Sequence, residues 1–256
     1  MKTNSMFAKA SKILKDDGFI ALFFRFNNYL FKGFWMRAKV FHHDNAQDVF
    51  TEIYKTNYWG SEESISGTGS EISQTELISN ELPKLFQKYS VKTFLDAPCG
   101  DFSWMKRVIK KCNIDYIGAD IVADLVESNN KSFSNESISF VHLDICNDDL
   151  PQADLMLCRD CLFHLSFADI KSFFMQFSNS NIEYLLLTNH KQFEKKFKNL
   201  DIKTGDFRML DLFSEPINLN PNVNYRFDDY KDPEPPREIC LFSRSQIHEC
   251  IAKWQY

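Results

Sequence analysis

The sequence predicts an α/β protein built on a doubly wound, mostly parallel sheet. Short apolar runs alternate with amphipathic stretches, which is the order expected when crossover helices connect parallel strands. Three successive apolar runs each end in an aspartate, at Asp96, Asp120 and Asp144. The chain of 256 residues is long enough for one large domain with an appendage, and short for two full domains.

The expected elements alternate regularly along the chain. Strands are predicted over short apolar runs: Lys92–Asp96, Asp115–Asp120, Ser137–Asp144, Asp154–Arg159, Ile182–Thr188 and Arg237–Phe242. Helices are predicted where apolar residues recur every three or four positions: Glu76–Tyr89, Phe102–Cys112, Val122–Lys131 and Phe167–Phe177. Residues 41–75 are polar and glycine-containing, and they are predicted as loop. Right-handed crossovers would place helices on both faces of the sheet.

Residues 1–50 are predicted to form a basic, aromatic-rich helical arm ahead of a main domain at 51–256. The first 40 residues carry eight Lys and Arg against two Asp, a local balance of +6. Such a segment can lie on an anionic membrane surface. The preferred interpretation is an arm packed on the main domain or on another subunit of a homo-oligomer. The arm precedes every cofactor element, so it is expected to be dispensable for cofactor binding.

Composition restricts the partners and the compartment. The net charge of −5 argues against nucleic acid as the main partner, because phosphate contacts require clustered Lys and Arg. The seven cysteines lack framework spacing and follow no secretory signal, which is typical of reduced thiols in a cytoplasmic protein. No apolar run approaches the ~20 residues of a membrane span. We therefore expect a cytoplasmic protein, with peripheral contact to the inner face of the membrane left open.

The aspartates that end the strands suit a ligand with an adenosine end and an amino-acid end. Ligands of open α/β sheets bind beyond the carboxyl ends of the strands. Asp120 would accept both ribose hydroxyls, and Asp144 would accept the adenine amino group between Ile121 and Ile145. Asp96 or its loop would face the ammonium and sulfonium end, with Gly100 allowing close backbone approach. A dinucleotide is disfavoured, because the loop lacks G-x-G-x-x-G and Asp101 would repel a pyrophosphate.

The motifs around these aspartates resemble those of a known family. The runs "FLDAPCGDFSWM", "YIGADIV", "FVHLDI" and "ADLMLCRDCLFHLS" resemble successive cofactor motifs of class I S-adenosylmethionine (SAM)-dependent methyltransferases. More narrowly, the sequence is similar to a bacterial subgroup associated with capsule and surface-polysaccharide biosynthesis. The resemblance covers about residues 57–245, including "YWG" at Tyr58–Gly60 and "SGTGS" at Ser66–Ser70. The first loop departs from the commoner D-x-G-x-G pattern by placing Pro98 and Gly100 after Asp96.

The resemblance implies a Rossmann-like fold, SAM as cofactor and a set of site residues. The cofactor contacts would come from the first loop, the later strand ends and the end of the fourth strand: Asp96, Ala97, Pro98, Gly100, Asp120, Ile121, Asp144, Ile145 and Arg159. Substrate contacts would come from the two conspicuous loops ahead of the sheet and from cations in the C-terminal third: Trp59, Ser70, Arg208 and Arg237. Guanidinium groups suit the phosphates of a nucleotide- or lipid-linked sugar.

His164 is the first choice for a catalytic base. It lies four residues after Asp160, so a helical turn would project both side chains the same way. A neutral imidazole can remove a hydroxyl proton near pH 7. Asp160 would orient His164 or bind substrate, and His190 is the reserve base. Asp144, Asp160 and His164 could gather a divalent cation, but their spacing is not a dedicated metal motif, so no metal is expected.

The expected function is therefore SAM-dependent methyl transfer to an oxygen of a saccharide intermediate in capsular or surface-polysaccharide biosynthesis. A nucleotide- or lipid-linked sugar would be the acceptor. The nearest alternatives are a phosphate-type glycan substituent or a small metabolite. RNA or DNA modification, or SAM binding without catalysis, are alternatives of other classes. Fold similarity alone cannot choose among acceptors.

Overall fold

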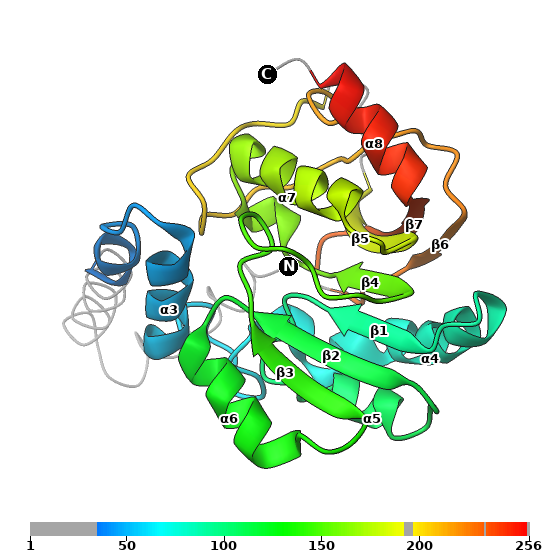
Figure 1. The fold of residues 1–256 in the computed structure, drawn as a ribbon. Helices are drawn as coiled ribbons and strands as arrows, with labels where there is room; N and C mark the ends of the chain where they lie inside the picture. The colour runs from blue at the N-terminus through cyan, green and yellow to red at the C-terminus, as the bar shows by residue number, and fades with distance from the viewer. Residues whose placement is uncertain (1–34, 192–196, 233, 255–256) are drawn as a thin grey trace.

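Seven strands form a single sheet in the computed structural model, which describes residues 35–191, 197–232 and 234–254 (Figure 1). The strand order is β3-β2-β1-β4-β5-β7-β6. β1 to β5 pair in parallel, and β7 is antiparallel to both of its neighbours. The strands are β1 (Thr93–Asp96), β2 (Asp115–Asp120), β3 (Ile138–His142), β4 (Leu155–Cys158), β5 (Tyr184–His190), β6 (Tyr225–Asp228) and β7 (Arg237–Ser243). The prediction of a doubly wound, mostly parallel sheet is confirmed.

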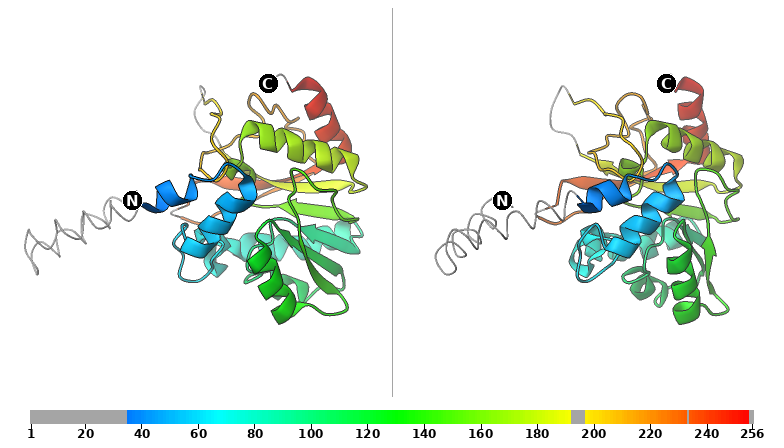
Figure 2. Two further views of the ribbon diagram at one scale, coloured as in Figure 1. Left: turned by 60° about the vertical axis from the view of Figure 1, so that its left-hand side comes forward. Right: turned by 90° about the vertical axis from the view of Figure 1, so that its left-hand side faces the viewer.

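Helices cover both faces of this sheet (Figure 2). The helices are α3 (Ala46–Thr56), α4 (Ile72–Lys88), α5 (Met105–Ile109), α6 (Ala123–Phe133), α7 (Phe167–Asn179) and α8 (Arg244–Lys253). One apolar cluster joins the sheet to α7 and α8, and a second joins it to α4, α5 and α6. All four residues of β4 are buried, as expected for a central strand covered on both sides. The order of the strands reverses between β1 and β4, which places a binding crevice beyond their carboxyl ends.

The prediction that residues 41–75 form a loop is wrong, because α3 lies within that range. The Asn45 side chain caps α3 by accepting a hydrogen bond from the Asp48 backbone N–H. Val49 and Ile53, four positions apart, are buried on one face of α3. Because only these two apolar residues mark the buried face and most of their neighbours are polar, the helical periodicity is weak in the sequence.

The predicted arm is described only in part. α3 runs across residue 50, where the boundary between arm and main domain was expected, and residues 35–40 are helical. Residues 1–34, which hold most of the basic and aromatic positions of the arm, lie outside the described residues. Within the described part of the chain, no helix is long and apolar enough to cross a membrane.

Three further elements differ from the prediction. β6, a four-residue edge strand, was missed, and its alternation of Tyr225 and Phe227 with polar residues is the only sequence signal for it. α8 was missed although Ser243 and Gln246 form a capping box, whose S-x-x-Q spacing is visible in the sequence. The helix expected from residue 102 begins only at Met105, because Phe102 has a left-handed backbone with φ of 57°.

Candidate active site

A cavity of about 480 Å³ lies at the carboxyl edge of the parallel strands. This volume falls within the roughly 300–1,000 Å³ of small-molecule sites. Because β7 is antiparallel, its first residue, Arg237, reaches the same edge. The structure brings nearly all of the sequence-predicted site residues to this cavity: Trp59, Ser70, Asp96, Pro98, Gly100, Asp120, Ile121, Asp144, Ile145, Arg159, Asp160, His164, His190 and Arg237.

Ala97 and Arg208 are not among the residues that line the cavity. Ala97 is fully buried in the core, and its backbone N–H donates to the Leu157 carbonyl at 2.9 Å. The guanidinium of Arg208 donates from Nη1 to the Leu165 carbonyl at 2.6 Å and stacks on the Phe167 ring. Burial lowers the pKa of Arg208 to about 10. These contacts tie Arg208 to the chain after β4, so the structure does not support its expected contact with substrate.

Asp96 ends β1 as a buried carboxylate with one hydrogen-bond donor. The Tyr116 hydroxyl donates to its Oδ2 at 2.8 Å, and the residue is 3% exposed. Burial raises the pKa of Asp96 to about 7, although the Tyr116 hydrogen bond and the charge of Arg159 act in the opposite direction. The carboxyl group is therefore poised to ionise near neutral pH, and a cation bound beside it would favour the ionised form.

Asp120 is held in place by the backbone of its own neighbourhood. Its Oδ2 accepts from the Gly100 N–H at 3.1 Å, and its Oδ1 accepts from the Val122 N–H at 3.0 Å. Burial raises the pKa of Asp120. A carboxylate offers about four lone-pair directions, so each oxygen can accept a further hydrogen bond from a ligand.

A glycine is required at position 100 by the packing of the protein itself, as well as by the close approach of a ligand. Its φ is 57°, and an ideal Cβ would lie 2.3 Å from the Ser66 Oγ. That hydroxyl accepts from the Asp101 N–H at 3.0 Å, which joins the Ser66 loop to the loop after β1. The glycine predicted to admit a ligand thus also admits the Ser66 loop.

Asp101 is not placed where it would repel a pyrophosphate, contrary to the sequence-based expectation. Its Oδ2 accepts from the Ser64 hydroxyl at 2.8 Å, and Asp101 is not among the cavity-lining residues. The nearest helix begins four residues later, at Met105. Asp101 therefore does not lie at a helix start, where it would repel a pyrophosphate. The lack of a G-x-G-x-x-G motif is the remaining reason to disfavour a dinucleotide.

Asp144 forms a tight turn beyond β3. Its Oδ1 accepts from the Cys146 N–H at 2.9 Å, and its Oδ2 accepts from the Asn147 amide at 2.8 Å. Ile121 and Ile145 line the cavity beside it, together with Leu125 and Leu143. This end of the cavity combines apolar walls with a fixed acceptor, which suits a flat heterocycle with an amino group.

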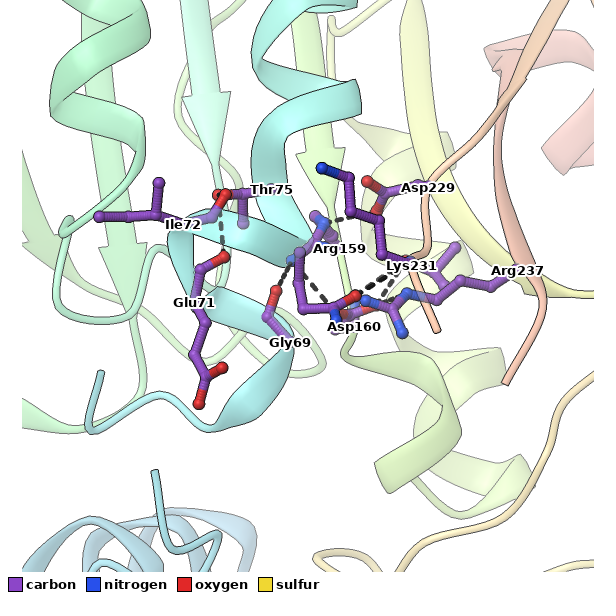
Figure 3. Close-up of polar contacts among 11 residues, drawn as sticks. Gly69, Glu71, Ile72, Thr75, Arg159, Asp160, Asp229, Lys231 and Arg237 are labelled. Carbon is purple, nitrogen blue, oxygen red and sulfur yellow. Dashed lines mark hydrogen bonds and ion pairs between the residues drawn. The ribbon is translucent and has the colours of Figure 1, made fainter. Parts of the chain in front are cut away.

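Asp160 lies between two buried arginines (Figure 3). Arg159 Nη1 is 3.1 Å from its Oδ2, and Arg237 Nε is 3.4 Å from its Oδ1. Burial alone would raise the pKa of Asp160, but Arg159 and Arg237 outweigh it and the pKa is lowered. Asp160 is therefore ionised at neutral pH and belongs to an ion-pair cluster.

Arg159 extends the cluster to distant parts of the chain. Its Nε donates to Oδ2 of Asp229 at 2.7 Å, and its Nη1 donates to the Gly69 carbonyl at 2.9 Å. Gly69 belongs to the 3₁₀ turn η1 (Thr68–Ser70), and Asp229 follows β6. Arg159 thus fastens the loop ahead of the sheet and the end of β6 to the end of β4.

His164 carries its lone pair on Nε2. It ends the 3₁₀ turn η2 (Leu162–His164), and its Nδ1 lies 2.8 Å from the Asp206 carbonyl oxygen. A carbonyl only accepts, so Nδ1 carries the proton and Nε2 is basic. Burial lowers the pKa of His164, which keeps the ring neutral at pH 7. The expected orienting role of Asp160 is thus filled by the Asp206 backbone.

His190 has the opposite tautomer. The Leu210 backbone N–H donates to its Nδ1 at 3.2 Å, so the proton of the neutral ring lies on Nε2. Burial lowers the pKa of His190 to about 4. His190 therefore presents a donor at Nε2 and is poorly suited to the reserve-base role.

Around His164, sequence reasoning named Trp59 but missed Phe207 and Arg37. The Trp59 and Phe207 rings lie 5.2 and 5.9 Å from its imidazole, between ring centroids, and both line the cavity. Arg37 also lines the cavity and forms two hydrogen bonds to the Asp206 carboxylate. Phe207 is 52% exposed, which marks the open side of the pocket. No motif in the sequence links these positions, which are distant along the chain.

Within the described ranges, no group of three His, Cys, Asp or Glu side chains is placed to hold a metal ion. The seven cysteines, all within the described residues, are free thiols, and Cys158 and Cys161 are buried.

No family model and no curated protein matches this sequence. Solved structures match its fold. Human N-acetylserotonin methyltransferase in complex with SAM matches with a TM-score of 0.53 at 16% identity, over 78% of this chain and 59% of that one. A SAM-dependent methyltransferase from Leishmania major matches with a TM-score of 0.57 at 12% identity, over 77% and 84% of the two chains.

A third match is 1,6-didemethyltoxoflavin-N1-methyltransferase from Burkholderia thailandensis, bound to 1,6-didemethyltoxoflavin and S-adenosylhomocysteine (SAH). Its TM-score is 0.55 at 11% identity, over 77% of this chain and 86% of that one. At these identities the likeness establishes the fold alone. The chain has the Rossmann-like fold of class I methyltransferases, and it spans about three fifths of the length of the human enzyme.

Proposed function

We propose that this chain is a SAM-dependent methyltransferase that methylates an oxygen atom of a small acceptor. One observation carries the proposal. The same cavity holds the carboxylates of Asp96 and Asp120 on one side and the basic Nε2 of a neutral His164 on the other. The first side suits a cationic nucleoside, and the second suits a hydroxyl that must lose its proton.

The residues at the ends of β1 to β4 fit SAM. Asp96 would bind the positively charged amino-acid end, beside the loop of Pro98 and Gly100. Asp120 would accept the ribose hydroxyls, and Asp144 the adenine amino group. Nη2 of Arg159 is buried and has no hydrogen-bond partner among the described residues, so it is suited to the ligand's carboxylate. SAM, when bound, supplies an electrophilic methyl group.

His164 would accept the proton of the acceptor hydroxyl at Nε2. Its Nδ1–H bond to the Asp206 carbonyl fixes the ring orientation, and the ionised Asp160 favours the imidazolium that forms. The charge of the ring then returns to zero when the proton passes to solvent. Neutral His164 thus supplies the base, and alignment in the cavity supplies the remaining rate enhancement.

The proposed acceptor is a nucleotide- or lipid-linked saccharide of capsular or surface-polysaccharide biosynthesis, methylated in the cytoplasm or at the inner face of the membrane. The sequence resemblance to that bacterial subgroup supports this choice. Trp59 and Phe207 supply aromatic faces at the open side of the cavity, and such faces can pack against a sugar ring.

Methyl transfer from labelled SAM to a panel of nucleotide-sugars, free sugars and small phenols tests this proposal. We expect a product that is heavier by one methylene unit and carries an O-methyl group on the sugar. Transfer to phenols alone would contradict the saccharide part. Transfer to nitrogen would contradict the oxygen part, and SAH production with no acceptor would contradict both.

A further inference from the structure

Arg237 is a buried cation with hydrogen-bond donors left over. It is 3% exposed, yet neither Nε nor Nη2 has a hydrogen-bond partner among the described residues. Its link to Asp160 is an ion pair of 3.4 Å at Nε, which leaves Nη2 unengaged. Leaving a buried donor unpaired is unfavourable, and more so for a charged group, so these N–H groups are suited to bind an acceptor.

Arg237 and Arg159 both contact Gly69, but Arg237 lies opposite His190 in the sheet, which points it to the acceptor side. The charge of Arg159 acts on Asp96, and it lowers the pKa of that carboxyl group. Arg237 pairs instead with His190 in the β5–β7 register. It also flanks Gly69, whose ideal Cβ would be 3.7 Å from its Nη2, while Trp59 packs on Gly67 two residues away. Arg237 and Trp59 thus border the same short loop.

The two arginines keep hydrogen-bond donors available for one more anion. Asp160 is shared by the two guanidinium groups, and Asp229 is bound by Arg159. The charges of Arg159 and Arg237 are therefore balanced, but Nη2 of each guanidinium has no hydrogen-bond partner among the described residues. Guanidinium forks bind carboxylate and phosphate oxygens with matching geometry. Glu234 also lines the cavity and would oppose an anion, whereas Glu238, next to Arg237 in sequence, is outside the cavity lining and accepts a hydrogen bond from Asn189.

We propose that Arg237 binds an anionic group of the methyl acceptor, a carboxylate or a phosphate, so that the substrates of this site are acidic. This inference rests on the proposed methyltransferase function, because it assigns Arg237 to the acceptor and Arg159 to the cofactor. The anionic group would anchor the acceptor beside Gly69 while Trp59 covers its ring.

Calorimetric titration of the SAH-saturated protein tests the assignment, because SAH already occupies the cofactor side. The probes are glucuronate, glucose 6-phosphate, acetate and inorganic phosphate, with glucose as the neutral match. We expect at least one acid to bind and glucose to bind at least tenfold more weakly. The preference between glucuronate and glucose 6-phosphate identifies the anionic group.

Three variants complete the test. R237K keeps the charge and loses the fork, and it should weaken acid binding about tenfold or more without changing SAH affinity. R226K, on β6 and outside the cavity lining, should leave both unchanged. E234Q removes the opposing charge and should tighten acid binding, which gives a result that does not depend on R237K folding.

The inference is overturned if no acid binds better than glucose while SAH binds normally. Equal acid binding by wild type and a folded R237K protein would also overturn it, and so would weaker acid binding by E234Q. Absence of SAH binding would instead contradict the proposed function itself, and the inference would fall with it.

Discussion

The two sides of the cavity hold their polar groups in different ways. At the ends of β1 to β3, Asp120 and Asp144 each accept a hydrogen bond from the backbone N–H two residues later in the chain. Asp120 also accepts one from the Gly100 N–H, twenty residues earlier. At the ends of β4 and β5 the partners are remote. On the acceptor side His164 reaches Asp206 across 42 positions, and Arg237, at the start of β7, pairs with Asp160 after β4. The cofactor side is therefore local and self-supporting, whereas the acceptor side depends on the assembled fold.

This difference predicts that the two functions can be separated by mutation. Changes on the acceptor side should lower turnover and spare cofactor affinity, and changes on the cofactor side should do the reverse. The predictions below test that separation.

The largest expected effect is that of His164→Ala on turnover. Loss of a positioned base should lower the turnover number about 10²–10⁴-fold on the true acceptor. Cofactor affinity should change little, because the imidazole lies on the acceptor side. The pH–rate profile should also lose its histidine ionisation, which lies below the ordinary value because burial lowers the pKa of His164.

His190→Ala is the matched control. His190 has its proton on Nε2, so its removal should not abolish the ionisation seen in the pH–rate profile. If His190→Ala abolishes turnover and His164→Ala retains it, the assignment of the base is reversed.

Gly69→Ala should have the next largest effect. Its new methyl carbon would lie 2.5 Å from Oδ2 of Asp160, a carboxylate that two arginines hold in place. Such overpacking costs typically ~1–3 kcal/mol, which corresponds to a factor of roughly 5 to 160 in an equilibrium constant. Turnover should fall by that order, and the Gly69→Ala and Asp160→Ala changes in thermal stability should be non-additive. Additive effects would show that the two groups do not collide.

Cofactor affinity should depend on pH through Asp96. Burial raises the pKa of Asp96 to about 7, so the group is protonated below that value and must release its proton when it binds a cation. Affinity for SAM should therefore fall up to about tenfold per pH unit below pH 7 and level off above it. Asp96→Asn should bind SAM more weakly at pH 8 and lose this dependence. A wild-type affinity that is flat between pH 6 and 8 would contradict the assignment.

The smallest expected effect concerns the arm. Arg37 pairs with Asp206 through an exposed bidentate contact, with side chains 55% and 31% exposed. Such surface pairs contribute about 0–1 kcal/mol, so Arg37→Gln should lower turnover at most severalfold through the Asp206 loop. SAM affinity should be unchanged in a binding titration. A clear loss of SAM affinity would show that the arm supports the cofactor side.

The same local-versus-remote difference explains what the sequence could predict. The aspartates at the ends of β1, β2 and beyond β3 were predictable, because each follows its own apolar run. His164 could be placed near the end of β4, but its partner Asp206 could not, since no pattern connects a loop carbonyl to a histidine 42 residues earlier. The contacts of Arg208 could not be predicted for the same reason. Its partners, the carbonyl oxygens after β4, carry no side-chain signal.

α3 shows a second limit. Its helical spacing rests on two buried residues, Val49 and Ile53, which form a small cluster of their own with Val40. Phe41 and Trp59 also pack against this cluster, and Phe50 and Tyr54 of the same helix line the cavity. The polar composition of this segment predicted a loop, but packing of its buried residues against the rest of the fold stabilises a helix.

A binding titration with SAM and SAH tests the central claim most directly, that the edge of β1 to β3 is a cofactor site. We predict that both ligands bind the wild-type protein in one-to-one ratio and that NAD does not compete. Asp120→Ala should weaken both by roughly 100-fold or more, because it removes two charge-assisted hydrogen bonds. Asp124→Ala, outside the cavity lining, should bind as wild type does. Failure of SAM and SAH to bind, or tighter binding of NAD, would contradict the account.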